Sequence, residues 1–119
     1  MKIAVSSSGV DLDSEVDPRF GRAHYILLVD PGDLSFEVMD NSENLNALKG
    51  AGIQTAAAIC NKGAAVLLTG HCGPNAFKVL KTAGVKVANN AHGTVRDAVE
   101  SYLSGTLVIT DEPDVEGQW

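Results

Sequence analysis

Apolar runs of strand length occupy the first third of the chain. Residues 2–6 form a short continuous run, 25–30 (YILLVD) is typical of a strand buried on both faces, and 35–40 (SFEVMD) alternates between apolar and polar positions. The Pro-Gly-Asp sequence at 31–33 is a turn signal, which predicts that the second and third strands form a hairpin. The polar stretch 41–49 is expected to be a loop.

From residue 50 the apolar residues recur at helical spacing instead. Ile53, Ala56, Ala57 and Cys60 predict a helix that stops at a Lys-Gly pair, residues 62–63. Because Cys60 lies on the inward stripe of this helix, we expect it to be a small buried residue of the core.

The rest of the chain alternates strands and helices. The apolar runs 65–69 and 85–88 predict two strands. Between them, Pro74 suits the first turn of a helix that ends at Gly84. After the second strand, Thr94 is a suitable N-cap for a last helix. The apolar residues on one side of that helix are Val95, Ala98, Val99 and Tyr102.

This order, βββαβαβα, predicts a mixed sheet. Strand–helix–strand units favour parallel pairing with right-handed crossovers, and the early hairpin adds antiparallel strands at one edge. The simplest solution is an α/β fold with a five-stranded sheet of order 3-2-1-4-5 and helices on both faces. Strands 1 and 4 then meet at a topological switch point. The loops 6–22, 70–75 and 89–94 are therefore expected to converge on a ligand crevice at the carboxyl ends of strands 1, 4 and 5.

Composition and charge are those of one globular domain with a short tail. The chain has 119 residues, of which 45% are hydrophobic and 20% charged. We expect a single domain over 1–110 and a flexible acidic tail over 111–119. The net charge of −6 argues against a nucleic-acid partner. Because the sequence shows neither a signal peptide nor a run of membrane length, a cytoplasmic protein with reduced cysteines and no membrane partner is expected.

The Gly-His-Cys-Gly-Pro-Asn loop after the fourth strand carries the most candidate chemistry. Gly70 and Gly73 let a ligand approach the backbone, and the helix start near Asn75 directs N–H groups toward an anion. Cys72 offers a soft sulfur and His71 an imidazole, so both are candidate metal ligands. A tight turn with a partly buried cysteine is the alternative, because a closed metal site normally needs about four ligands.

Arg19 and Arg22 stand in an Asp-Pro-Arg-Phe-Gly-Arg turn of the first long loop. Guanidinium groups present forked donors that suit oxyanions and thiometallate sulfurs. We expect both arginines to be charge partners of an anionic ligand, not metal ligands. The alternative is that each arginine forms an ion pair with a nearby carboxylate, that of Asp11, Asp13 or Asp17.

Two weaker signals remain. His92 could project into the same crevice from the third loop, although a solvated histidine near a helix cap is the alternative. A ribonuclease-H-like hydrolase would need carboxylates from several strands gathered on Mg²⁺. At their ends the core strands offer only Asp30 and Asp40, so we do not expect an enzyme.

Four segments in order resemble the dinitrogenase iron–molybdenum cofactor biosynthesis family (NifX/NafY-like). They are KIAV at 2–5, DPRFGRA at 17–23, GAGIQ at 50–54 and TGHCGPNAF at 69–77. The likeness extends from residue 1 to about residue 105. It implies a ribonuclease-H-like sheet, in agreement with the strand order above, and the binding or carriage of a preformed cluster instead of turnover.

The resemblance also implies a cofactor and a partner. The branch of the family that the chain most resembles, from sulfate-reducing bacteria, holds a mixed molybdenum–copper sulfide cluster. An anionic cluster of this type would be held by Arg19, Arg22 and the backbone N–H groups near Gly73 and Asn75. The family is associated with MinD-type P-loop ATPases, which implies such a partner. A metal-free adaptor for that ATPase is the alternative function.

Overall fold

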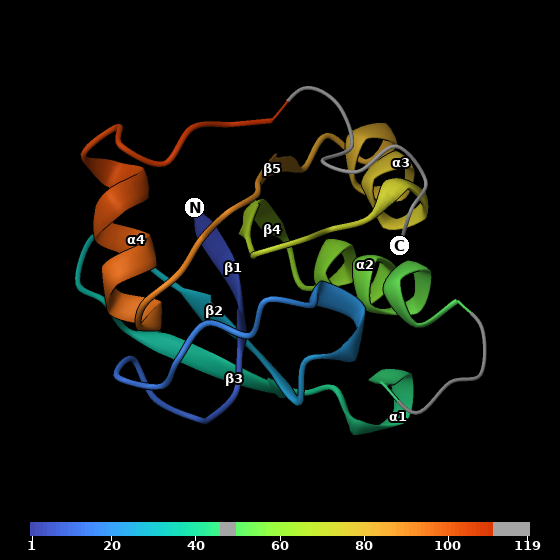
Figure 1. The fold of residues 1–119 in the computed structure, drawn as a ribbon, viewed down its shortest axis with the longest axis horizontal. Coiled ribbons are helices and arrows are strands. Elements are labelled where there is room, and N and C mark those ends of the chain that lie inside the picture. The colour runs from blue at the N-terminus through green and yellow to red at the C-terminus, as the bar shows by residue number, and fades with distance from the viewer. Residues whose placement is uncertain (46–49, 111–119) are drawn as a thin grey trace.

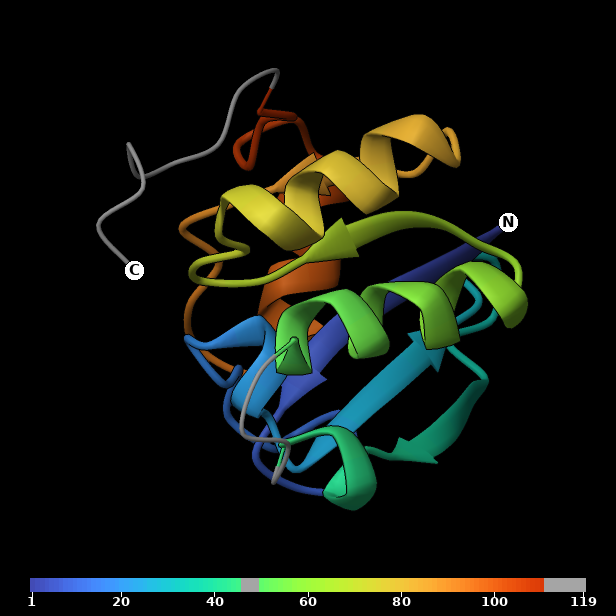
Figure 2. The ribbon, with the colours of Figure 1, turned by 90° about the vertical axis from the view of Figure 1, so that its right-hand side faces the viewer.

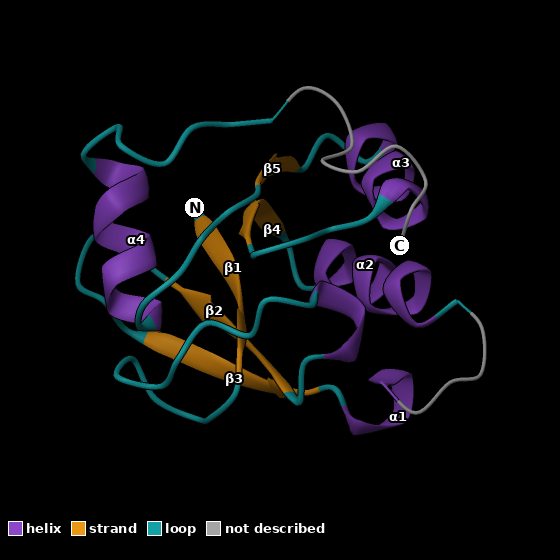
Figure 3. Cartoon of the chain, viewed as in Figure 1, coloured by secondary structure: helices purple, strands orange, loops and turns teal. Residues whose placement is uncertain are grey.

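The computed structural model describes residues 1–45 and 50–110 (Figures 1 and 3). The strands are β1 (Lys2–Ser7), β2 (Tyr25–Val29), β3 (Phe36–Asp40), β4 (Ala64–Leu68) and β5 (Lys86–Ala88). The α-helices are α1 (Ser42–Leu45), α2 (Ala51–Asn61), α3 (Pro74–Thr82) and α4 (Val95–Leu103), and a 3-10 turn, η1, spans Phe20–Arg22.

The sheet is mixed, and its strand order β3-β2-β1-β4-β5 confirms the prediction. β1 pairs antiparallel with β2, and β2 with β3, whereas the pairs β1–β4 and β4–β5 are parallel. In the central strand, Ile3 lies between Val29 and Val66 and is completely buried. The carboxyl ends of β1, β4 and β5 therefore point to the same edge, as the ribonuclease-H-like arrangement requires.

Helices cover both faces of this sheet, as predicted (Figures 1 and 2). On one face, α2, α3 and η1 enclose a core that includes Phe20, Leu67 and Phe77. On the other face, α4 packs against the sheet through residues that include Val95 and Val99. α4 begins with the predicted Thr94 cap, whose hydroxyl accepts the Asp97 N–H while the Asp97 carboxylate accepts the Thr94 N–H.

The inward stripe of α2 differs from the predicted one. Ile53 is 42% exposed and Ala57 is exposed, so their assignment to the inward stripe was wrong. The buried residues of α2 are Ala51, Thr55, Ala56 and Ile59. Thr55 can point inward because its hydroxyl is hydrogen-bonded to the Ala51 carbonyl and to the Asn41 side chain. Cys60 is half-buried and packs against the core.

The predicted loop 41–49 begins instead with the short helix α1. The Asp40 carboxylate accepts the Ser42 N–H at 2.8 Å, which turns the chain into this helix. Residues 46–49, and the tail expected at 111–119, lie outside the described residues. Across the described part of the chain, none of the helices combines the length and the apolar character that crossing a membrane would require.

Gly21 of η1 lies directly against the first turn of α2. A Cβ atom on Gly21 would be 2.5 Å from the backbone nitrogen of Gly52 and 2.6 Å from its Cα. Both groups are main-chain atoms, so the contact cannot be relieved by a change of side-chain rotamer. The absence of a side chain at Gly21 therefore sets the distance between η1 and α2.

We predict that Gly21→Ala separates η1 from α2 and lowers the free energy of unfolding by about 1–3 kcal/mol, as overpacking does elsewhere. Urea denaturation followed by circular dichroism measures this change. Gly32→Ala in the β2–β3 hairpin is the matched control, because a Cβ there meets only the Asp30 carboxylate, at 3.2 Å. An equal loss of stability in both variants would contradict the proposed contact.

Candidate functional site

Backbone hydrogen bonds join the predicted loops at the carboxyl edge of the sheet. The His71 N–H donates to the Pro18 carbonyl at 2.7 Å, and the Phe20 N–H donates to the His71 carbonyl at 3.2 Å. The Asn90 N–H donates to the Gly70 carbonyl at 2.9 Å. The loop after β4 is thus held between the loops that follow β1 and β5, and the convergence expected from topology is present.

Gly70 has a packing role in this arrangement. It is buried, and a Cβ atom at this position would lie 2.7 Å from both the Cα and the carbonyl oxygen of Pro18. The two loops can approach this closely only because Gly70 has no side chain. Gly70 itself does not line the pocket described next.

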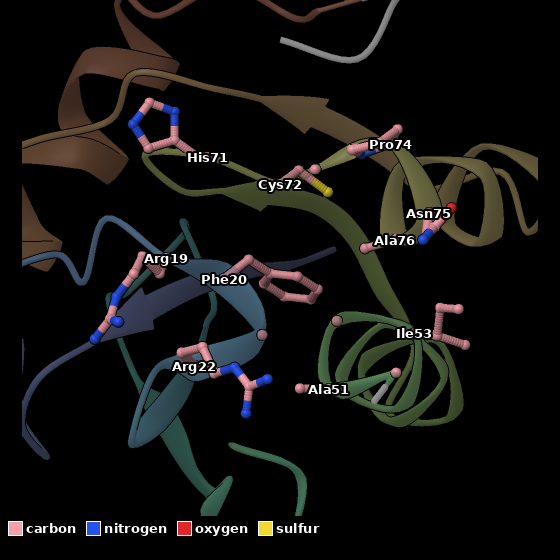
Figure 4. A pocket seen from close by; sticks show the side chains of 14 residues that line it. Arg19, Phe20, Arg22, Ala51, Ile53, His71, Cys72, Pro74, Asn75 and Ala76 are labelled. Carbon is pink, nitrogen blue, oxygen red and sulfur yellow. The ribbon is translucent and has the colours of Figure 1, made fainter. Parts of the chain in front are cut away.

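A pocket of about 410 Å³ opens where η1 and the starts of α2 and α3 meet (Figure 4). This volume lies within the range of small-ligand sites. Three segments form its walls, namely residues 19–22, 50–53 and 71–76. The close-up shows the Phe20 ring and the Cys72 sulfur directed into the space between these segments.

Two helix N-termini face this pocket. The first turns of α2 and α3 both line it, and neither helix has a side-chain cap or an acidic residue in its first turn. The N–H groups of a first turn have no partners within their own helix, and each helix start carries about half a positive charge. The lining residues include no Asp or Glu among the described ones. The walls therefore favour an anion.

Both arginines of the predicted site line the same pocket, but their side chains differ in direction. Arg22 extends toward the start of α2, whereas the Arg19 guanidinium is directed away from the Phe20 ring (Figure 4). The carboxylates of the first loop have other contacts. Asp13 forms an ion pair with Arg96 at 3.3 Å, and the Asp17 carboxylate accepts the backbone N–H of Arg19 at 3.0 Å.

Cys72 and His71 both line the pocket, with Cys72 buried and His71 half-buried. The other cysteine, Cys60, stands near the far end of α2, where burial raises the pKa of its thiol. Among residues 1–45 and 50–110, no three His, Cys, Asp or Glu side chains come together in a way that could hold a metal ion. The residues that line the pocket thus include one thiol and one imidazole as candidate metal ligands, although the His71 ring is directed away from the Cys72 sulfur (Figure 4).

The remaining predicted residues divide between two places. Gly73 and Asn75 line the pocket at the start of α3. His92 lies instead in a separate hollow beside α4, together with Asp97 and Glu100. Its ring Nδ1 is 3.0 Å from the Asn90 carbonyl oxygen. The structure therefore does not bring His92 together with the other candidate residues.

Sequence reasoning did not assign one wall of the pocket, residues 50–53. The sequence does indicate that a ligand could approach this wall closely, because the small residues Gly50, Ala51 and Gly52 stand where a helix begins. Gly50 adopts a left-handed conformation with φ of 74° and turns the chain into α2. The exposed side chain of Ile53 adds an apolar contact at the same wall.

Comparison with known proteins identifies relatives over almost the whole chain. The model of the dinitrogenase iron-molybdenum cofactor family matches residues 1–105. The apo form of the orange protein from Desulfovibrio gigas is 42% identical, with 96% of each chain covered and a TM-score of 0.93. A NifB candidate from Thermotoga, determined by NMR, is 34% identical, with 98% of each chain covered and a TM-score of 0.83.

A more distant structure shows the same fold. A candidate dinitrogenase from Methanocaldococcus jannaschii is 18% identical, with 95% of this chain and 97% of that chain covered and a TM-score of 0.71. A search among curated proteins gave no match. The family model and the two closer structures agree with each other and with the observed sheet order. The chain therefore belongs to the dinitrogenase iron–molybdenum cofactor family.

Proposed function

We propose that this protein binds and carries a preformed, anionic metal–sulfur cluster that contains molybdenum. The cluster would occupy the pocket between η1 and the starts of α2 and α3, beyond the carboxyl ends of the central strands. Membership of the iron–molybdenum cofactor family supports a metal cluster as the cargo. A mixed molybdenum–copper sulfide is the composition that the sequence resemblance implies.

One observation carries this proposal: two uncapped helix N-termini and two arginines line a pocket whose described lining residues include no carboxylate. The field of a helix end acts only within about its first turn. Two such ends at one pocket therefore act on the same small ligand. The Arg22 guanidinium adds a full charge and several donors that can point at sulfide or oxide ligands.

The donor set fits a ligand that brings its own sulfur. A bare metal ion would need about four protein ligands, whereas the pocket presents one thiol and one imidazole. A sulfide cluster has most of its metal coordination already filled. Cys72 could then bond to the cluster through one open metal position, while Phe20 and Ile53 exclude water. These residues bind and shield the cargo and carry out no chemical turnover.

We predict that the apo-protein becomes coloured when it is incubated with tetrathiomolybdate and copper, and that the colour remains with the protein. Gel filtration with absorption spectroscopy and metal analysis of the protein peak measures this. A colourless protein peak after this treatment would exclude carriage of a molybdenum–copper sulfide.

We predict that Arg22→Gln weakens retention of this cluster about fivefold, equivalent to roughly 1 kcal/mol, the upper range for an exposed charge pair. Retention should also fall in about 1 M salt, where the Debye length is about 3 Å. Dialysis of the loaded protein followed by metal analysis gives both values. Arg96→Gln is the matched control, because Arg96 is partly exposed and pairs with Asp13 outside the pocket. Equal losses in both variants would contradict a local role of Arg22.

A third prediction concerns the thiol. If enclosure and charge hold the cluster, Cys72→Ser retains the colour, with a shifted absorption spectrum where the sulfur had been bonded to metal. Complete loss of colour in Cys72→Ser, with the fold intact, would instead make the thiol indispensable.

The adaptor function for a MinD-type P-loop ATPase stays a prediction. It would be favoured by a protein that remains colourless and co-elutes with such an ATPase.

A further inference from the structure

Asn89 follows β5 directly and reaches across to the pocket loop. Its side chain is only 3% exposed, and its Oδ1 accepts the backbone N–H of Cys72 at 3.0 Å. This hydrogen bond is buried and joins residues that are 17 positions apart. Asn89 does not line the pocket itself, so it acts on the pocket only through its neighbours.

The hydrogen bond from Asn89 continues a series of hydrogen bonds between the segment after β4 and the segment after β5. The Thr69 N–H donates to the Ala88 carbonyl at 3.1 Å, and the Asn90 N–H donates to the Gly70 carbonyl at 2.9 Å. The Asn89 side chain adds the next hydrogen bond of this series, to the Cys72 N–H. Directly after it the chain turns at Gly73, whose φ of 83° leads into α3. The Cys72 backbone is therefore held at the last position before the turn.

Within residues 1–45 and 50–110, the other half of the Asn89 amide has no partner. Its Nδ2 is buried and makes no hydrogen bond to any of these residues. Leaving a buried donor without an acceptor is energetically unfavourable, and such groups are rare in folded proteins. An aspartate would also accept the Cys72 N–H, but it would add a negative charge behind a wall that faces an anion. Asparagine supplies the acceptor without the charge.

We propose that Asn89 is a positioning residue of the cargo site, which fixes the Cys72 backbone so that the thiol sulfur faces the pocket. The proposal rests on the proposed function for the identity of the cargo, but not for the geometry of the thiol. The sulfur is directed into the pocket in the structure (Figure 4). Without Asn89, the buried Cys72 N–H would lose this acceptor, and the loop would be less firmly held against opening to water.

The first test uses the apo-protein in a Cys60→Ser background, so that Cys72 is the single thiol. We expect Asn89→Ala to increase the rate of Cys72 alkylation by iodoacetamide at least about fivefold, as loss of a buried hydrogen bond predicts. Asn89→Asp keeps an acceptor and should give no increase. Asn41→Ala is the matched control, because Asn41 is also fully buried and its Nδ2 donates to Ala23 at another loop.

An alkylation rate that is unchanged in Asn89→Ala, or raised equally in Asn41→Ala, would overturn the proposal. If Asn89→Ala does not fold, the Asn89→Asp variant still decides it. In that variant, the Cys72 backbone N–H should remain hydrogen-bonded. Its signal in a nitrogen–proton NMR spectrum should therefore exchange slowly with solvent deuterium. Rapid exchange of this amide in a folded Asn89→Asp protein would show that the side chain does not hold Cys72.

The second test is a double-mutant cycle on the protein loaded with tetrathiomolybdate and copper. We expect Asn89→Ala to weaken cluster retention about fivefold when Cys72 is present and less than about twofold in the Cys72→Ser background. Equal losses in both backgrounds would mean that Asn89 does not act through the thiol. If the parent protein retains no cluster, the proposed function fails, whereas the alkylation test of Asn89 still stands.

Discussion

The site depends on two close backbone approaches, Gly21 against Gly52 and Gly70 against Pro18. The first brings η1 to the start of α2, and the second brings the loop after β4 to the loop after β1. A methyl group at either glycine would collide with main-chain atoms, which cannot rotate away. These contacts place the walls of the pocket relative to the sheet.

The electrostatic character of the pocket follows from the same contacts. The field of a helix end weakens beyond about one turn. Two helix starts reinforce each other at a ligand only if both lie within that distance. α2 and α3 pack on the same face of the sheet, and the Gly21–Gly52 contact joins the start of α2 to η1. Arg22 is therefore carried by η1 to the same place as the N–H groups.

The sequence predicted those features that depend on local patterns. The strand order and the Thr94 cap follow from apolar periodicity and cap chemistry, and the structure confirms both. The inward face of α2 could not be predicted in the same way. Its buried side includes Thr55, whose hydroxyl is satisfied by Asn41, a partner that only the folded chain supplies.

The same limit applies to the pocket. Cys72 and Arg22 could be placed there because they follow β4 and β1 at the switch point. The wall formed by residues 50–53 could not, since it depends on a contact between distant glycines. His92 also follows a strand at that edge. Its loop leads directly into α4 and is joined to the loop after β1, because the Gly93 carbonyl accepts the Val16 N–H at 2.8 Å.

An acidic protein can hold an anion if its own carboxylates stay away from the site. The sequence contains no Asp or Glu between Glu43 and Asp97, the part of the chain that contains α2, β4, α3 and β5. The acidic first loop directs Asp13 to Arg96 and turns the Asp17 carboxylate to a backbone N–H. The net charge of −6 therefore repels large polyanions at a distance, while a small anion inside the pocket lies beside Arg22 and two helix N-termini, with no Asp or Glu among the described lining residues. Charge distribution, not total charge, decides what this pocket accepts.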